Sequence, residues 1–258
     1  MPYAMNGGTR IEYEVEGDGP ALVLQHGFTQ KAKEWKSAGY VEALTPHYRV
    51  ILVSARGHGG SDKPYDRASY TLDRHVDDIA AVLDVLNLRR AHFWGYSMGG
   101  WIGFGMAKYA PQRVDALIIG GAQPFGRTVP PSLPDGSNPK AFLEDFLRRI
   151  GVGSLEALSP EVRADILDND CRALAAAQQD RPSLEDVLPT MAMPCFLYAG
   201  EADGVCRKVE ACAKQLRHAT FISFPGFDHG AAFYRADVIL PPIIAFLQAL
   251  RDRQKAAT

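Results

Sequence analysis

The residues Phe93-Trp94-Gly95-Tyr96-Ser97-Met98-Gly99-Gly100 govern how the rest of the chain is interpreted. An apolar run ends at Gly95, a serine follows two residues later, and two glycines precede an apolar segment with helical spacing. Strand, sharp turn and helix around G-x-S-x-G are typical of a nucleophile elbow, in which a strained backbone holds the serine hydroxyl clear of the sheet. The alternative is a glycine-rich turn without a chemical role, and other parts of the chain must distinguish the two.

The composition is that of an ordinary globular protein. The 258 residues are 47% hydrophobic and 22% charged, so one α/β domain with a large core is expected. A formal net charge of −2 argues against a nucleic-acid or anionic-membrane partner. No uncharged apolar run of about 18 residues occurs, and the N-terminus lacks the pattern of a signal peptide. We therefore expect a cytoplasmic protein without a membrane span.

The cysteines show no metal-binding or disulfide pattern. None of the four forms a C-x-x-C pair or has a histidine pair nearby (Cys171, Cys195, Cys206, Cys212). In a reducing compartment such residues are free thiols in the core or at the surface. We expect neither a metal nor a cofactor.

Apolar runs that suit buried strands alternate with segments of helical spacing. After an N-terminal hairpin over residues 2–16, strands are expected at 21–24, 49–53, 91–94, 114–119, 195–199 and 219–224. Helices are expected at 34–44, 71–88, 98–110, 205–216 and 236–251. Alternation at such short intervals implies an α/β fold with a parallel sheet covered on both faces.

The alternation is interrupted between residues 123 and 190. This part begins with a proline-rich loop and continues with helical patches at 140–150, 160–168, 171–179 and 184–188. Ser159 before Pro160 suits a helix start, because it combines an N-cap residue with proline at the first helical position. We expect a single domain over residues 1–258, with a core of 1–122 and 191–258 and a helical cap of 123–190.

A serine hydroxyl needs a base to take its proton, and a histidine oriented by a carboxylate is the usual arrangement. In a parallel α/β sheet these partners should follow the serine in the order acid, then histidine, each just past the carboxyl end of a strand. Asp203 follows the strand 195–199, and His229 follows the strand 219–224. Glu201 is the rival acid, and Asp228 is expected to shape the histidine loop.

Two backbone N–H groups are expected to stabilise an oxyanion. One belongs to Met98, the residue after the serine, at the positive end of its helix. The other is expected at Phe28, in the loop after the strand 21–24, where Gly27 lets the backbone approach closely. His26 is expected to have a structural role in this loop.

Several motifs in a fixed order resemble the α/β-hydrolase fold family, in its serine-nucleophile, esterase- and lipase-like branch. They are His26-Gly27-Phe28, Arg56-Gly57-His58-Gly59-Gly60-Ser61, Gly95 to Gly100, Gly200-Glu201-Ala202-Asp203 and Asp228-His229. The resemblance implies a mostly parallel eight-stranded sheet flanked by helices, with a helical cap insertion. Haloalkane dehalogenases and epoxide hydrolases carry aspartate at the position of Ser97 and are set aside.

One position departs from the family pattern. Ser54 stands where the family commonly has a loop-ordering aspartate, before the motif x-R-G-x-G-x-S. The difference bears on the rigidity of that loop rather than on the chemistry.

The leading hypothesis is a serine hydrolase that cleaves carboxylic esters or lactones of small, largely apolar substrates through an acyl-enzyme. Ser97 would be the nucleophile, His229 the general base and acid, and Asp203 the orienting acid. The same triad also serves cofactor-free perhydrolases, C–C bond hydrolases and amidases. A hypothesis from another class is a non-catalytic receptor that keeps the fold and its pocket.

The substrate is less well defined by the sequence than the reaction. Candidate pocket residues in the cap are apolar (Phe125, Phe142, Phe146, Leu147). The sequence of the cap shows no basic cluster, which disfavours strongly anionic substrates. We expect a small-molecule ester as the partner, with no nucleic acid and no membrane.

Overall fold

The computed structural model describes residues 1–130 and 134–256, and the side chains as far as Arg253. Within these residues eight strands form one sheet, in the order β1-β2-β4-β3-β5-β6-β7-β8. The strands are β1 (Tyr3–Asn6), β2 (Thr9–Glu16), β3 (Ala21–Gln25), β4 (Arg49–Val53), β5 (Ala91–Tyr96), β6 (Val114–Gly120), β7 (Cys195–Gly200) and β8 (Ala219–Phe224). The pairs β1–β2 and β2–β4 are antiparallel, and every other pair is parallel. The expected eight-stranded, mostly parallel sheet is confirmed.

Helices cover both faces of this sheet because its central strands are apolar on both sides. The helices are α1 (Glu34–Ser37), α2 (Tyr40–Leu44), α3 (Leu72–Val85), α4 (Met98–Tyr109), α5 (Pro139–Arg149), α6 (Pro160–Leu167), α7 (Cys171–Ala177), α8 (Cys206–Ala213), α9 (Ala231–Tyr234) and α10 (Ala236–Ala256). On one face α3, α4 and α8 share a core through Val76, Phe104 and Val209. On the other, α2, α9 and α10 pack around Tyr40, Phe233 and Ile243. No helix in the described ranges is long and apolar enough to span a membrane.

The single helix expected over residues 34–44 is wrong. Gly39 adopts a left-handed conformation with φ of 87°, which ends α1 and allows α2 to begin in a new direction. The apolar spacing of the segment continues across this break. The periodicity of the apolar residues alone therefore did not reveal the break at Gly39.

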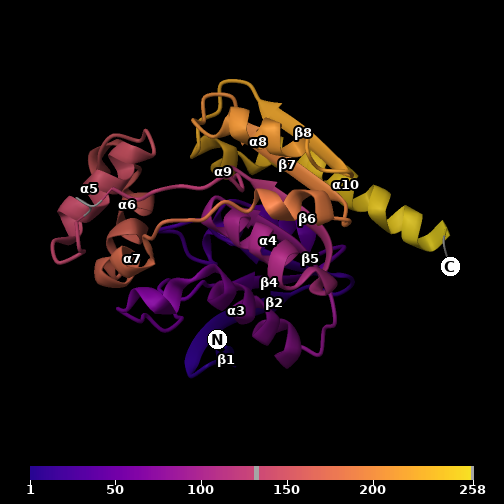
Figure 1. Ribbon diagram of the computed structural model, residues 1–258, viewed down its shortest axis with the longest axis horizontal. Helices are drawn as coiled ribbons and strands as arrows, with labels where there is room; N and C mark the ends of the chain where they lie inside the picture. Colours follow the sequence, from indigo (N-terminus) through magenta and orange to yellow (C-terminus); the bar gives the residue numbers. More distant parts are fainter. Residues whose placement is uncertain (131–133, 257–258) are drawn as a thin grey trace.

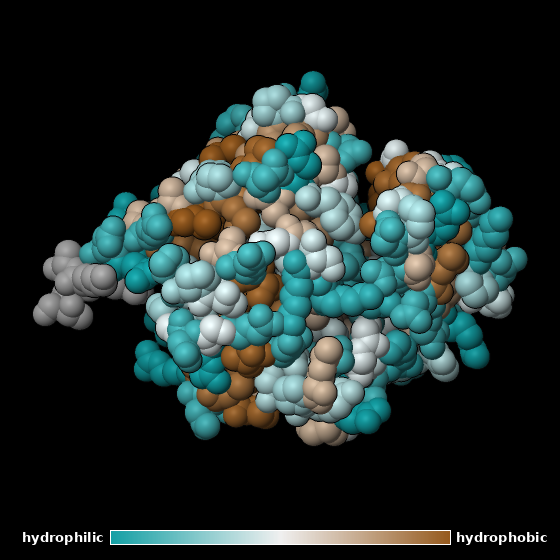
Figure 2. Space-filling model, turned by 180° about the vertical axis from the view of Figure 1, so that it is seen from behind, coloured by the Kyte–Doolittle hydropathy of each residue, from teal (hydrophilic) through white to brown (hydrophobic). Residues whose placement is uncertain are grey.

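The segment between β6 and β7 forms a lobe of its own, built from α5, α6 and α7 (Figure 1). We call this part of the chain, residues 121–194, the β6–β7 segment. Its helices bury a small apolar cluster of their own (Phe142, Leu143, Leu147, Leu155, Ile166, Leu174). The expected helix start at Ser159 is confirmed, because its side chain accepts a hydrogen bond from the N–H of Val162 at 3.4 Å. From behind, the lobe stands at the right and a notch separates it from the rest of the molecule (Figure 2).

The loop after β4 is ordered by a carboxylate from the neighbouring strand β2. The hydroxyl of Ser54 and the N–H of Gly60 both donate to Oε2 of Glu12, each at 2.8 Å. The hydroxyl of Ser61 closes the loop by donating to the carbonyl of Ser54 at 2.6 Å. In this chain Glu12 thus supplies the loop-ordering charge that the sequence resemblance led us to expect from an aspartate at position 54.

Candidate active site

The elbow places Ser97 between the end of β5 and the start of α4. Its φ of 52° and ψ of −109° lie outside the regions that ordinary residues favour. Two hydrogen bonds hold it there. The N–H of Ser97 donates to the carbonyl of Gly120 at 2.8 Å, and its own carbonyl accepts from the N–H of Trp101 at 3.0 Å. The strain is a fixed feature of the turn, as expected for a functional residue.

Two glycines make this turn possible. A Cβ atom on Gly99 would lie 2.1 Å from the carbonyl oxygen of Gln25, and one on Gly95 would lie 2.1 Å from the carbonyl oxygen of Gly99. Both obstacles are backbone atoms, which cannot rotate away as a side chain can. The elbow and β3 therefore pack more closely than any residue other than glycine allows.

We expect the variant Gly99→Ala to be destabilised by about 3 kcal/mol or more, because the added methyl forces the elbow away from β3. Urea unfolding measures this. Gly204→Ala is the matched control, since a Cβ there meets no atom within 4 Å and the residue does not need a positive φ. It should stay within about 0.5 kcal/mol of the parent. Equal stability of the two variants would contradict the close packing at the elbow.

The structure brings Ser97, His229 and Asp203 into one hydrogen-bonded row. Nε2 of His229 lies 2.9 Å from Oγ of Ser97, and Nδ1 lies 2.6 Å from Oδ2 of Asp203. An ionised carboxylate only accepts hydrogen bonds, so Nδ1 carries the proton and Nε2 is free to accept one from the serine hydroxyl. The side chain of Asp203 is only 5% exposed, and that of His229 is 21% exposed. The row therefore runs from a buried acid to an accessible hydroxyl.

The loops that carry the acid and the histidine are tied to each other and to the elbow. The N–H of Ala202 donates to the carbonyl of Phe227 at 2.9 Å. The hydroxyl of Tyr96 donates to the carbonyl of His229, and the two rings lie 5.2 Å apart. Tyr96 is a residue that sequence reasoning missed. Its place directly before Ser97 was the available signal.

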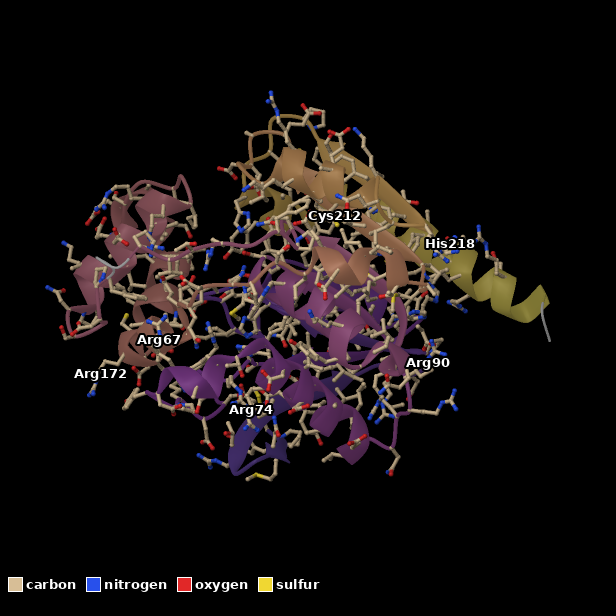
Figure 3. The ribbon with its side chains drawn as sticks, viewed as in Figure 1. Arg67, Arg74, Arg90, Arg172, Cys212 and His218 are labelled. Carbon is tan, nitrogen blue, oxygen red and sulfur yellow. The ribbon has the colours of Figure 1, made fainter. Side chains whose placement is uncertain are left out.

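The side chains that could have replaced the acid or the histidine lie outside the hydrogen-bonded row. Glu201 accepts a hydrogen bond from Ser223 at 3.0 Å and is exposed. Asp228 accepts from the N–H of Ala231 at 2.7 Å, as expected of a residue that shapes the loop. His218 lies toward the opposite end of the sheet from the β6–β7 segment (Figure 3). Of these, none takes the place of Asp203 or His229 in the row.

Two N–H groups are available beside Ser97. In the described ranges the N–H of Phe28 has no acceptor, and that of Met98 opens α4, where no intrahelical acceptor exists. Both residues and Ser97 line the same cavity. An oxyanion at this point would receive two donors and the positive end of a helix.

The loop that carries Phe28 is held by His26. Nδ1 of His26 donates to the carbonyl of Gly27 at 2.7 Å, and its Nε2 accepts from the N–H of Ala55 at 3.0 Å. Complete burial lowers the pKa of His26 to about 4, so the ring is neutral at physiological pH. A neutral ring whose two nitrogens are both in hydrogen bonds stabilises the loop and is not available as a base.

Ser97 opens into a cavity of about 780 Å³ between the sheet and the β6–β7 segment. Of the candidate pocket residues, Phe146 and Leu147 line this cavity, and the ring of Phe146 packs 5.1 Å from that of Phe28. Phe142 does not line it, because it is fully buried in the apolar cluster of the lobe. Phe125 does not line it either and packs against the main core.

The cavity wall also contains polar residues that the sequence did not indicate. They include Arg127, Arg149, Arg181 and Gln178 from the β6–β7 segment, and Glu34 and Tyr234 from the other side. The expectation that the cap offers no basic cluster is therefore wrong. These arginines are far apart in the sequence, so no run of basic residues indicated that they would lie in one cavity wall.

Among the described residues, no group of three or more His, Cys, Asp or Glu side chains is placed to hold a metal ion.

Comparison with known proteins places this geometry in a family. A family model described as the alpha/beta hydrolase fold matches residues 20–196. The chain is 25% identical over 272 residues to the bifunctional esterase/perhydrolase DCH of Acinetobacter calcoaceticus, covering 94% of this chain and 97% of that protein. An N-acyl homoserine lactone degrading enzyme of known structure superposes with a TM-score of 0.77 at 26% identity, over 95% of this chain and 100% of that one.

Other curated relatives match over a shorter length. A Bacillus subtilis (strain 168) protein, provisionally assigned as 2-succinyl-6-hydroxy-2,4-cyclohexadiene-1-carboxylate synthase, is 33% identical over 123 residues. That match covers 46% of this chain and 44% of that protein, so this chain spans less than half the length of the relative. The sheet order, the elbow and the family match agree, and the chain belongs to the α/β hydrolase fold family.

Proposed function

We propose that this protein is a serine hydrolase that cleaves carboxylic esters or lactones through an acyl-enzyme. The observation that carries the proposal is the row from Asp203 through His229 to Ser97, with contacts of 2.6 and 2.9 Å, in which His229 and Ser97 line the cavity. In this proposal residues 123–190 act as a cap that encloses the substrate over Ser97. The cavity wall drawn from both the sheet and the β6–β7 segment supports that role.

The geometry suggests how each group would act. Oγ of Ser97 attacks the ester carbonyl carbon while Nε2 of His229 takes its proton, and the resulting oxyanion accepts from the N–H groups of Phe28 and Met98. The bond to the alcohol oxygen then breaks, and His229 returns the proton to that oxygen. A water molecule repeats the sequence on the acyl-enzyme, releasing the acid and restoring Ser97. Asp203 keeps the imidazole in the required tautomer and stabilises its charged form.

The relatives support ester chemistry and suggest one variation. One is named for both esterase and perhydrolase activity, and another degrades a lactone. In perhydrolysis, hydrogen peroxide would replace water in the second half of the reaction and release a peracid. The same residues would serve both reactions, so the rate with each nucleophile distinguishes them.

A panel of substrates tests the proposal. It contains esters of graded acyl length, two lactones and one amide, with and without added hydrogen peroxide. We expect hydrolysis of esters or lactones well above the rate on the amide, because an amine leaves less readily than an alcohol. Turnover of the amide alone would contradict ester hydrolysis in favour of an amidase. No turnover on any member would favour a non-catalytic receptor.

A further inference from the structure

Two arginines face each other in the wall of the cavity. Arg127, on the loop that leaves β6, and Arg181, after α7, form an isolated antiparallel bridge. Each N–H donates to the carbonyl of the other residue at 2.8 Å. Residues that exchange both backbone hydrogen bonds project their side chains to the same side of the pair. The two side chains thus leave the bridge on the same side, and both residues line the cavity that contains Ser97.

The two arginines repel each other, and an anion bound between them would relieve that repulsion. Arg127 is exposed, so the cost falls mainly on Arg181, which is half-buried. Like charges placed directly opposite destabilise a strand pair. In the described ranges no carboxylate lies within 4 Å of either guanidinium group. Asp180 accepts a hydrogen bond from the N–H of Val129 at 2.7 Å. Partial burial lowers the pKa of Arg127, and the charge of Asp180 opposes this only in part. Arg181 lies 4.3 Å above the ring of Trp101, which removes water from its other side. Loss of solvent and the charge of Arg127 lower the pKa of Arg181, yet a guanidinium stays protonated at neutral pH.

A third polar residue lines the same cavity. Gln178 is only 5% exposed, and its Oε1 accepts a hydrogen bond from Arg149 at 3.1 Å. This fixes the orientation of the amide, and its Nε2 is buried with no partner among the described residues. A buried donor without an acceptor is costly, and a bound acceptor would remove that cost. Arg149 itself is already neutralised by Asp145, at 2.8 Å.

We propose that Arg127, Arg181 and Gln178 form a carboxylate subsite, so that the preferred ester carries a free carboxylate in addition to the bond that is cleaved. This rests on the proposed function of Ser97. Two guanidinium groups and an amide offer several N–H donors to a planar anion, which arginine binds with two parallel hydrogen bonds. The same wall has an apolar part formed by the β6–β7 segment (Phe146, Leu147, Ile150, Val152, Val162, Ile166). A substrate with an apolar body and one anionic group fits both features.

Two pairs of substrates of equal shape test the subsite. Monoethyl adipate and ethyl 5-carbamoylpentanoate place the charge, or a neutral amide, on the acyl side. 3-Carboxyphenyl butanoate and 3-carbamoylphenyl butanoate carry the charge, or the neutral amide, on the alcohol side of the ester. We expect the anionic member of one pair to have a kcat/KM about tenfold or more above that of its neutral partner, measured by pH-stat. The pair that shows the preference identifies the side of the ester that the subsite holds.

The variants Arg127→Gln and Arg181→Gln should each lower kcat/KM for the anionic ester by about ten- to a hundredfold, while the neutral ester changes by less than about twofold. Arg172→Gln is the matched control, because this side chain lies at the outer margin of the lobe, over the ring of Tyr65 (Figure 3). It should leave both rates unchanged. Arg181→Gln could fail to fold, because the arginine packs on Trp101. In that case Arg127→Gln alone is compared with the parent, since the bridge of Arg127 to Arg181 uses only backbone atoms and is kept in that variant.

Two results would overturn the subsite while leaving ester hydrolysis intact. One is Ser97-dependent hydrolysis with no preference for the anionic member of either pair. The other is a preference that survives both arginine replacements. If no ester and no lactone is hydrolysed in a Ser97-dependent manner, the proposed function fails and the subsite fails with it.

Discussion

Replacement of Ser97 by alanine is expected to lower kcat for ester hydrolysis by about a million-fold, to the residual rate that binding and the oxyanion donors supply without a nucleophile. Only Oγ is removed, so the backbone bonds of Ser97 to Gly120 and Trp101 remain. The fold should therefore be unchanged. Initial rates on the best ester of the panel, with circular dichroism and thermal unfolding of both proteins, measure the effect.

A second serine controls for this experiment. Ser37 lies at the exposed end of α1, where its hydroxyl donates to the carbonyl of Lys33 at 3.3 Å, and it does not line the cavity. Ser37→Ala should keep the parent rate. A folded Ser97→Ala protein with more than about one hundredth of the parent kcat would show that another group performs the attack.

Replacement of Asp203 by asparagine is expected to lower kcat by about ten-thousandfold. The amide is nearly the same size as the carboxylate, and its oxygen is held at the Oδ1 position by the N–H of Val205, which donates there at 3.1 Å. The NH₂ group then faces Nδ1 of His229 and can only donate to it. This drives the ring proton to Nε2, which then no longer accepts the proton of Ser97. The loss should appear in kcat rather than in KM, because Asp203 does not line the cavity.

Glu201→Gln separates the two acids of this loop. Glu201 is exposed and accepts a hydrogen bond from Ser223, so its replacement should change kcat by less than about threefold. A deeper loss in Glu201→Gln than in Asp203→Asn would exchange the roles of the two residues.

The elbow was predictable from the sequence because its requirements are local. Gly95 and Gly99 flank the serine at the spacing that lets the turn approach β3, and this is visible without knowledge of the rest of the fold. The sequence was enough to predict that Asp203 and His229 lie near Ser97, since residues that follow parallel strands gather at one edge of the sheet. Their hydrogen bonds depend on loop geometry, which only the structure supplies.

The cavity wall was less predictable because it depends on packing between distant segments. Phe142 and Phe146 lie one turn apart on α5, yet the first is buried within the lobe and the second faces the cavity. Arg127 and Arg181 meet through a bridge between two irregular segments, for which no sequence pattern exists. Gly39 shows the same limit, because a helical spacing on either side of a glycine does not say whether the helix continues.

The loop after β4 shows how a departure from a family pattern can be compensated. Ser54 lacks the charge of the usual aspartate, but its hydroxyl reaches Glu12 on β2. The compensating residue lies on a neighbouring strand rather than in the motif. It could be found only after the strand pairing of β2 with β4 was known.

Labelling with a fluorophosphonate, followed by intact mass and peptide mapping, tests most directly whether Ser97 is the nucleophile. The row of hydrogen bonds to His229 and Asp203 leads us to expect one adduct per chain, on Ser97, and none in Ser97→Ala. An unlabelled parent protein, or an adduct that persists in Ser97→Ala, would contradict the serine hydrolase mechanism.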